Sequence, residues 1–109
     1  MSNWITICKN EDVIAGTGVC ALHQGEQVAI FKLFNTGSLH AVSNYDPIGD
    51  ANVMSRGIVG SIGDKLVVAS PLYKQHFCLE TGRCLEDESQ QLKTYEVRLK
   101  DDVIQLLAA

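Results

Sequence analysis

The sequence contains few prolines, which interrupt helices and strands, and no segment that would hold it in a membrane. Only two prolines occur among its 109 residues. No apolar run approaches the roughly 20 residues that a membrane-spanning helix needs. The N-terminal segment, MSNWITICKNED, has neither a basic start nor a long apolar stretch, so no secretory signal is apparent. We therefore expect a cytoplasmic protein without a membrane partner.

Basic residues are also scarce, and they are scattered along the chain. Nine Lys and Arg stand against thirteen Asp and Glu, which gives a net charge of −4. No stretch gathers them into a stripe that could follow a phosphate backbone, so we expect no nucleic-acid partner. The acidic run 86–88 could meet a basic patch on another protein, although such runs usually just face solvent.

Four cysteines are present, but none forms a Cys-x-x-Cys pair. In a reducing compartment we expect them to be free thiols. A two-residue turn at 81–82 would place Cys84 opposite Leu79 and Cys78 opposite Leu85. Because side chains alternate between the two faces of a strand, Cys78 and Cys84 would then lie on opposite faces without a disulfide.

The rest of the chain has the pattern of short strands separated by tight turns. Residues 28–31 (VAIF) and 66–69 (LVVA) are apolar runs typical of strands buried on both faces. Residues 95–100 (YEVRLK) alternate between apolar and charged side chains, and only the composition of 87–92 (DESQQL) favours a short helix. The length and pattern predict a single all-β domain over 1–109. The turn candidates are Gln24-Gly25, Thr36-Gly37, Gly63-Asp64, Thr81-Gly82 and Asp101-Asp102.

Two proline-containing loops follow predicted strands, at about 44–57 and 70–76. The first is the longest irregular interval in the chain, and a long loop in a small domain is usually functional. Two such loops side by side are a common way to hold a metal. Neither, however, carries Cys or His where a metal would need it.

The order of these features resembles the Rieske domain, which holds a [2Fe–2S] cluster between two loops. That family shows a strand, then Asn-x-Cys-Pro-His-x-Gly, an irregular stretch with a hairpin, Cys-Pro-x-His and finally Phe-x-Leu-x-Thr-Gly. Here the corresponding segments are NYDPIG, SPLY and FCLETG. The resemblance implies an antiparallel β sandwich or barrel of short strands and hairpins. The matching residues are Asn44, Pro47, Gly49, Pro71, Phe77, Leu79, Thr81 and Gly82.

By this resemblance the four iron-ligand positions fall on Asp46, Ile48, Ser70 and Tyr73. A Rieske centre needs two thiolates on one iron and two imidazoles on the other. Ile48 has no donor atom, and the Asp46 carboxylate is a hard ligand where soft thiolate is needed. We therefore expect this chain to hold no metal and no cofactor. Instead, Ile48 and Tyr73 should pack between the loops, and Asp46 should accept hydrogen bonds from Ser70 or from loop amides.

A finer resemblance is to the small subunits of bacterial NAD(P)H-dependent nitrite reductases. It implies a large-subunit partner that carries FAD, an iron–sulfur cluster and sirohaem and reduces nitrite to ammonium, in assimilation or dissimilation. This chain would then dock on or stabilise that subunit, with no catalytic or cofactor-binding residue of its own. The segments that carry the resemblance are GVCAL (18–22), QVAIF (27–31), SRG (55–57), VASPL (68–72) and EDE (86–88).

Four residues of the two loops are candidates for docking on such a partner, because their types are enriched at interfaces. They are Tyr45, Met54, Arg56 and Tyr73. The alternative is that Tyr45 and Met54 merely close the core of their loop.

Four functions other than docking are alternatives for this sequence. A free-standing binding module could use the vacated cleft for a small ligand or another protein, and an electron carrier is a third possibility. A zinc site would need ligands beside His76 and Cys78, such as Cys20 or Cys84, but the usual paired spacings are missing. Catalysis by this chain alone is not expected, since no histidine accompanies a nucleophile. His23, beside a turn, is interpreted as exposed.

Overall fold

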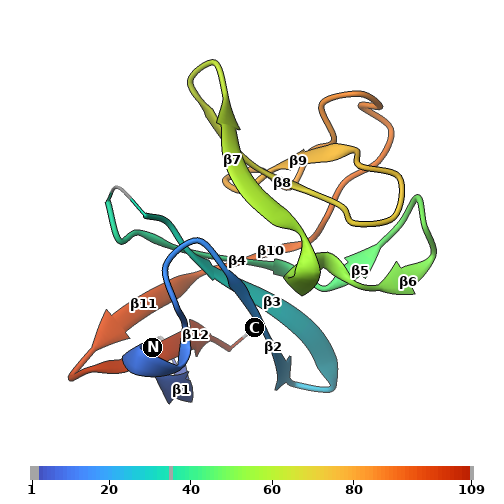
Figure 1. The fold of residues 1–109 in the computed structure, drawn as a ribbon. Helices are drawn as coiled ribbons and strands as arrows, with labels where there is room; N and C mark the ends of the chain where they lie inside the picture. The colour runs from blue at the N-terminus through green and yellow to red at the C-terminus, as the bar shows by residue number, and fades with distance from the viewer. Residues whose placement is uncertain (1–2, 35, 109) are drawn as a thin grey trace.

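The computed structural model describes residues 3–34 and 36–108, and it builds them from short antiparallel strands (Figure 1). Within these ranges the only helical segments are two single 3₁₀ turns, η1 (Asn10–Asp12) and η2 (Met54–Arg56). The prediction of an all-β fold is therefore confirmed. The strands are β1 (Trp4–Lys9), β2 (Gly18–His23), β3 (Glu26–Lys32), β4 (Leu39–Ser43), β5 (Tyr45–Asp46), β6 (Ala51–Asn52), β7 (Ile58–Ile62), β8 (Lys65–Ala69), β9 (His76–Cys78), β10 (Thr94–Tyr95), β11 (Val97–Lys100) and β12 (Val103–Leu107).

The molecule has a lower and an upper part in the view of Figure 1. The lower part contains the sheets β10-β4-β3-β2 and β1-β12-β11. The upper part contains the β5–β6 hairpin and the sheet β7-β8-β9, and it carries both proline-containing loops. Both loops therefore belong to the upper part, although η2 of the first loop contacts β2 and β3 of the lower part.

Strand β3 lies between two hydrophobic cores. Val28 and Ile30 pack into a lower core with residues of β12, whereas Ala29 and Phe31 pack into an upper core with residues of the loops and β8. All four side chains are fully buried. The continuous apolar run has no polar alternation because both faces of the strand are covered.

Several tight turns follow their local residue chemistry. The β2–β3, β7–β8 and β11–β12 hairpins each close through a two-residue turn, as predicted. Gln24-Gly25 and Asp101-Asp102 have positive φ at both positions, as type I′ turns require. In Gly63-Asp64 only the glycine has a positive φ, which fits a type II′ turn.

The predicted register after β9 is wrong. Phe77, rather than Leu79, pairs with Cys84, and the amide of Cys78 donates to the carbonyl of Arg83 at 2.9 Å. The connection therefore has four residues instead of two. Gly82 decides this, because it has φ +80° and lies so close to the Leu92 carbonyl that a β-carbon there would clash with it. The described cysteines are free thiols, as expected.

Two further details differ from expectation. The run 95–100 is divided at Glu96, because β10 pairs with β4 whereas β11 pairs with β12. Leu99, on β11, is half exposed. Residues 87–92 form no helix, and within the loop at 44–57 the short β5–β6 hairpin appears where no period was visible.

The two chain ends lie side by side at the β1–β12 edge, where the amide of Ala108 donates to the carbonyl of Asn3 at 2.8 Å. Figure 1 shows this edge in the lower part, away from the β5–β6 hairpin. Among the residues of the described ranges, no helix has the length and apolar character to span a membrane.

Candidate functional site

Asp46 joins the two proline-containing loops. Its side chain is completely buried at the end of β5. One carboxylate oxygen accepts the amides of Ile48 at 2.9 Å and Gly49 at 3.1 Å, and the other accepts the Ser70 hydroxyl. The Ser70 hydroxyl oxygen in turn accepts the amide of Leu72 at 3.3 Å. The expected hydrogen bonding of Asp46 is confirmed, and it includes both the hydroxyl and the loop amides.

Asn44 anchors the first loop to the lower sheet. Its side-chain carbonyl accepts the amide of Ser55 at 2.7 Å, so it bridges the beginning and the end of the loop. Its amide group donates to the Gln27 side chain at 3.0 Å and to the Cys20 sulfur at 3.4 Å. Asn44 is itself buried. One residue thus fixes the loop against both strands of the β2–β3 hairpin.

Ile48 and Tyr73, expected to share the volume between the loops, have different surroundings. Ile48 is half-buried and packs against the upper core. Tyr73 is 65 % exposed, so its predicted packing is wrong. The reason is a tight turn, in which the amide of Lys74 donates to the carbonyl of Ser70 at 3.0 Å and Lys74 has φ +63°. Leu72 instead covers Gly49, where a β-carbon would clash with it.

The docking candidates also differ in exposure. Met54 is fully buried in the upper core, so it closes the loop core and cannot meet a partner. Tyr45, Arg56 and Tyr73 are exposed. The Asp50 carboxylate, which accepts the Tyr45 hydroxyl, raises the pKa of that phenol. Sequence reasoning overlooked the exposed Leu72, although its place next to a turn proline was a signal.

The upper part also holds a pair of polar groups close to the second loop. The amide and the imidazole of His76 each contact the Glu86 carboxylate at 2.7 Å. Burial raises the pKa of Glu86, but the two hydrogen bonds from His76, its charge and the backbone amide of Glu86 together lower the pKa. Burial raises the pKa of the nearby Cys84 thiol. No group of three or more potential metal ligands occurs in the described ranges.

The interpretation of His23 as an exposed turn residue is wrong. It is 3 % exposed, and its ring meets the Tyr95 ring edge-on, with the centroids 6.0 Å apart. Its Nδ1 is buried and has no hydrogen-bond partner among the described residues. Position beside a turn did not predict exposure, because the distant strand β10 contributes the covering Tyr95.

The residues at the four ligand positions do not fit a [2Fe–2S] cluster. Both carboxylate oxygens of Asp46 are already engaged, Ser70 is committed to Asp46, and Ile48 has no donor atom. Tyr73 points outward on its turn and is exposed. A Rieske cluster needs two thiolates and two imidazoles, so this donor set cannot replace them.

The fold and the paired loops define a class of protein. The family described as "Rieske-like [2Fe-2S] domain" matches residues 3–107. The ferredoxin of carbazole 1,9a-dioxygenase from Nocardioides aromaticivorans has the same fold, with a TM-score of 0.80 and 17 % identity over 95 % of this chain and 96 % of that one. The chain is thus a Rieske-like domain.

Closer relatives define the family within this class. The nitrite reductase (NADH) small subunit of Salmonella typhimurium is 51 % identical over 106 residues, which are 97 % of this chain and 98 % of that protein. The solution structure of the nitrite reductase [NAD(P)H] small subunit from Erwinia carotovora has a TM-score of 0.84 and 46 % identity, and the match covers 100 % of this chain and 84 % of that one. The chain belongs to the family of NADH nitrite reductase small subunits.

A third relative has a different architecture. The nitrite reductase [NAD(P)H] large subunit of Klebsiella oxytoca is 32 % identical over 98 residues, which are 90 % of this chain but only 10 % of that protein. In Klebsiella oxytoca a segment similar to 90 % of this chain is therefore part of the large subunit itself.

Proposed function

We propose that this chain serves NADH-dependent nitrite reductase as a subunit that docks on the large subunit and carries no redox centre. The observation that supports this most directly is the buried Asp46–Ser70 contact. It joins the two loops through hydrogen bonds, a task that falls to the metal cluster in a Rieske protein. FAD, the iron–sulfur cluster, sirohaem and the reduction of nitrite to ammonium are accordingly assigned to the large subunit.

The Klebsiella relative supports a direct association. A domain similar to 90 % of this chain is covalently part of a large subunit there. Covalent linkage holds two domains at high effective concentration, which is useful only if they work together. The adjacent chain ends make such a linkage possible without covering the loops. We infer one copy of this chain per large subunit.

We further propose that the exposed loop residues form the docking face, which we define as Tyr45, Arg56, Leu72 and Tyr73. Tyrosine and arginine are among the residues that contribute most to binding when they become buried at an interface. The loops that carry them are held together by Asp46, so the face is formed before the partner binds. Pre-formed faces bind with a smaller loss of entropy.

The alternative of a free-standing module with a ligand between the loops has less support. Asp46, Ser70 and Ile48 occupy the space where such a ligand would have to enter. We also propose the cytoplasm as the compartment of this protein, because its described cysteines are free thiols.

Co-purification with the large subunit tests the proposed function. We expect a stable complex in a ratio of one to one, and higher nitrite-dependent NADH oxidation with this chain than without it. Arg56→Ala combined with Tyr73→Ala should weaken the complex at least tenfold. Leu22→Ala, at an exposed residue of the lower sheet, is the matched control and should leave affinity unchanged. A wild-type chain that never associates with the large subunit would overturn the proposal.

A further inference from the structure

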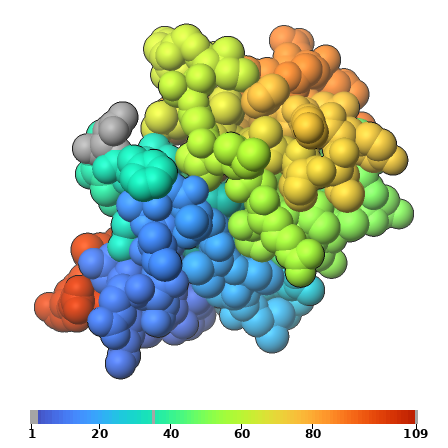
Figure 2. All heavy atoms as spheres, in the orientation of Figure 1, coloured from blue at the N-terminus to red at the C-terminus, as the bar shows by residue number. Residues whose placement is uncertain are grey.

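Strand β7 forms the outer edge of the upper sheet. In the described part of the chain it pairs only with β8, in the order β7-β8-β9. Its sequence, IVGSI, has no charged residue and no proline. Proteins normally protect an exposed edge with charges, proline or a bulge, because unpaired backbone groups invite another strand. The β7 edge has none of these protections, and Figure 2 shows the β7–β8 hairpin (yellow-green) at the molecular surface.

The hairpin geometry determines which backbone groups face outward. Ile62 and Lys65 flank the two-residue turn, so they form a hydrogen-bonded pair, and the pattern alternates along the strand. The backbone groups of Ile58, Gly60 and Ile62 therefore face β8. The N–H and C=O groups of Val59 and Ser61 point away from β8, toward the free edge.

The outer face of β7 is apolar and open. Ile58 is 78 % exposed and Ile62 is 43 % exposed. A β-carbon on Gly60, between them, would meet nothing within 4 Å. This face of β7 therefore has two large apolar side chains with a bare glycine between them. A side chain of an added strand would meet no obstacle over Gly60.

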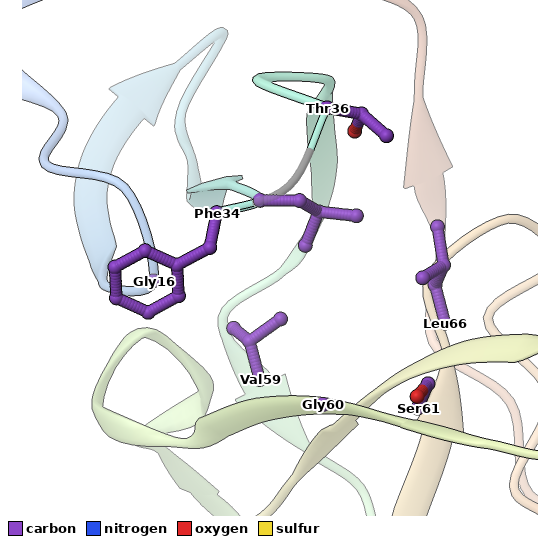
Figure 3. Close-up of a pocket in the computed structure, with 8 residues that line it drawn as sticks. Gly16, Phe34, Thr36, Val59, Gly60, Ser61 and Leu66 are labelled. Atoms are coloured by element: carbon purple, nitrogen blue, oxygen red, sulfur yellow. The ribbon is translucent and has the colours of Figure 1, made fainter.

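A hollow of about 220 Å³ opens on the other face of β7. Figure 3 shows Phe34 at one wall, on the side of Gly16, and Val59 and Ser61 at the other, on the side of β7. Phe34 is 78 % exposed although its ring covers Gly16. The remaining lining residues of the hollow are Leu33, Thr36, Gly60 and Leu66. The volume of the hollow suits one aliphatic or aromatic side chain.

We propose that β7 receives an extended segment of the large subunit as an added β-strand, with one apolar side chain of that segment inserted beside Phe34 and Val59. This mode of recognition combines main-chain hydrogen bonds for affinity with a side-chain pocket for specificity. The inference rests on the proposed function and names a second contact of the same partner. The edge contact extends the docking face, because Arg56 of that face lies two residues before Ile58, the first residue of β7.

Charge determines what kind of segment fits. The centre of β7 is uncharged, so the partner strand is uncharged and apolar opposite it. Arg56 is exposed just before the strand begins, so an acidic residue of the partner is favoured there. At the turn end, Asp64 and Lys65 carry opposite charges and favour neither sign.

Hydrogen exchange on the free chain and on its complex with the large subunit tests this inference. The amides of Val59 and Ser61 should exchange at least tenfold more slowly in the complex. The amides of Gly60 and Ile62, already bonded to β8, should change little. A formed complex in which Val59 and Ser61 exchange as fast as in the free chain would overturn the inference while leaving the proposed function intact. Protection of the same amides in a self-associated free chain would also overturn it.

A substitution provides a second test. Ser61→Pro removes one outward N–H without breaking a hydrogen bond to β8. Proline is tolerated on an edge strand when its nitrogen faces away from the neighbouring strand. The substitution should weaken the complex at least tenfold and change the melting temperature of the free chain little. Ile58→Lys should also weaken the complex, whereas Leu22→Lys, a comparably exposed residue on β2, should not. Unchanged affinity in both Ser61→Pro and Ile58→Lys would contradict the edge contact.

Discussion

At the scale of single residues, Asp46 joins the two loops that a [2Fe–2S] cluster joins in a Rieske protein. A buried carboxylate is costly unless its oxygens are engaged, and here one oxygen accepts two loop amides while the other accepts a hydroxyl from the opposite loop. The hydrogen-bond donors to Asp46 are only one serine hydroxyl and two amides of the local turn. Its chemistry was foreseeable from the sequence, because Asp and Ser stand where thiolates are needed.

Asp46→Ala should lower the free energy of unfolding by about 1–3 kcal/mol, because it leaves the buried Ser70 hydroxyl without its acceptor. Urea denaturation followed by circular dichroism measures the change. Glu88→Ala, which removes an exposed carboxylate outside the two loops, is the control and should cost less than about 0.5 kcal/mol. Equal denaturation midpoints for Asp46→Ala and wild type would contradict the assigned role.

Ile48→Ala should lower the free energy of unfolding by about 1–2 kcal/mol, since a half-buried side chain loses part of the value of full burial. In a domain of this size, 1 kcal/mol corresponds to a fall in melting temperature of roughly 4–8 °C. Differential scanning calorimetry gives the shift directly. Ile58→Ala is the matched control, because Ile58 is 78 % exposed. Packing of Ile48 would be disproved if both variants melted like wild type.

His40 should make stability depend on pH. Burial lowers its pKa in the folded protein, although Glu80 opposes this. The unfolded chain therefore binds the proton more readily, so the stabilisation is complete above about pH 6.5, the unfolded pKa, and is lost as pH falls through the folded pKa. Urea midpoints measured from pH 8 to 5 should fall more steeply in wild type than in His40→Gln. Parallel curves for the two proteins would contradict the expectation.

At the scale of elements, hairpins with two-residue turns were predictable because their geometry depends on adjacent residues. Gln24-Gly25, Gly63-Asp64 and Asp101-Asp102 all form as expected. The connection after β9 was not predictable in the same way. Its register depends on Gly82 meeting the carbonyl of Leu92, a residue of a later loop. A local rule cannot include such a contact.

The Asp101-Asp102 turn offers a test of these local rules. Both residues have positive φ, at 53° and 66°, where glycine is less strained than aspartate. Asp102→Gly should therefore raise the free energy of unfolding by about 0.5–1 kcal/mol. Asp64→Gly is the control, since Asp64 does not have a positive φ and glycine there should stabilise nothing. Thermal melts of the two variants should shift in different directions, and a loss of stability in Asp102→Gly would contradict the argument.

At the scale of the whole molecule, the fold separates the two proposed contact surfaces from the chain ends. The proposed docking face and the β7 edge belong to the upper part, and the paired ends belong to the lower part (Figure 1). Between them, β3 packs into both cores and so connects the two parts. A domain built this way can be a separate subunit or part of a longer chain and still present the same surfaces.

The whole domain should remain colourless after reconstitution with iron and sulfide, because its four ligand positions offer no thiolate or imidazole. Visible absorption and iron content per chain measure this, and a Rieske ferredoxin treated in the same way is the positive control. An iron–sulfur spectrum in the purified chain would disprove the proposed lack of a redox centre. This outcome is independent of whether the chain binds its partner.

The amino-acid sequence by itself determined the all-β class, the local hairpin turns and the chemistry at the four ligand positions, because these depend on residue type and on neighbours along the chain. The tertiary structure alone decided that Met54 and His23 are buried, that Tyr73 is exposed, and that β7 is an unprotected edge. Burial and edge position depend on which distant segment covers a residue. That covering comes from β10 for His23 and from the upper core for Met54, contacts that no pattern along the chain describes.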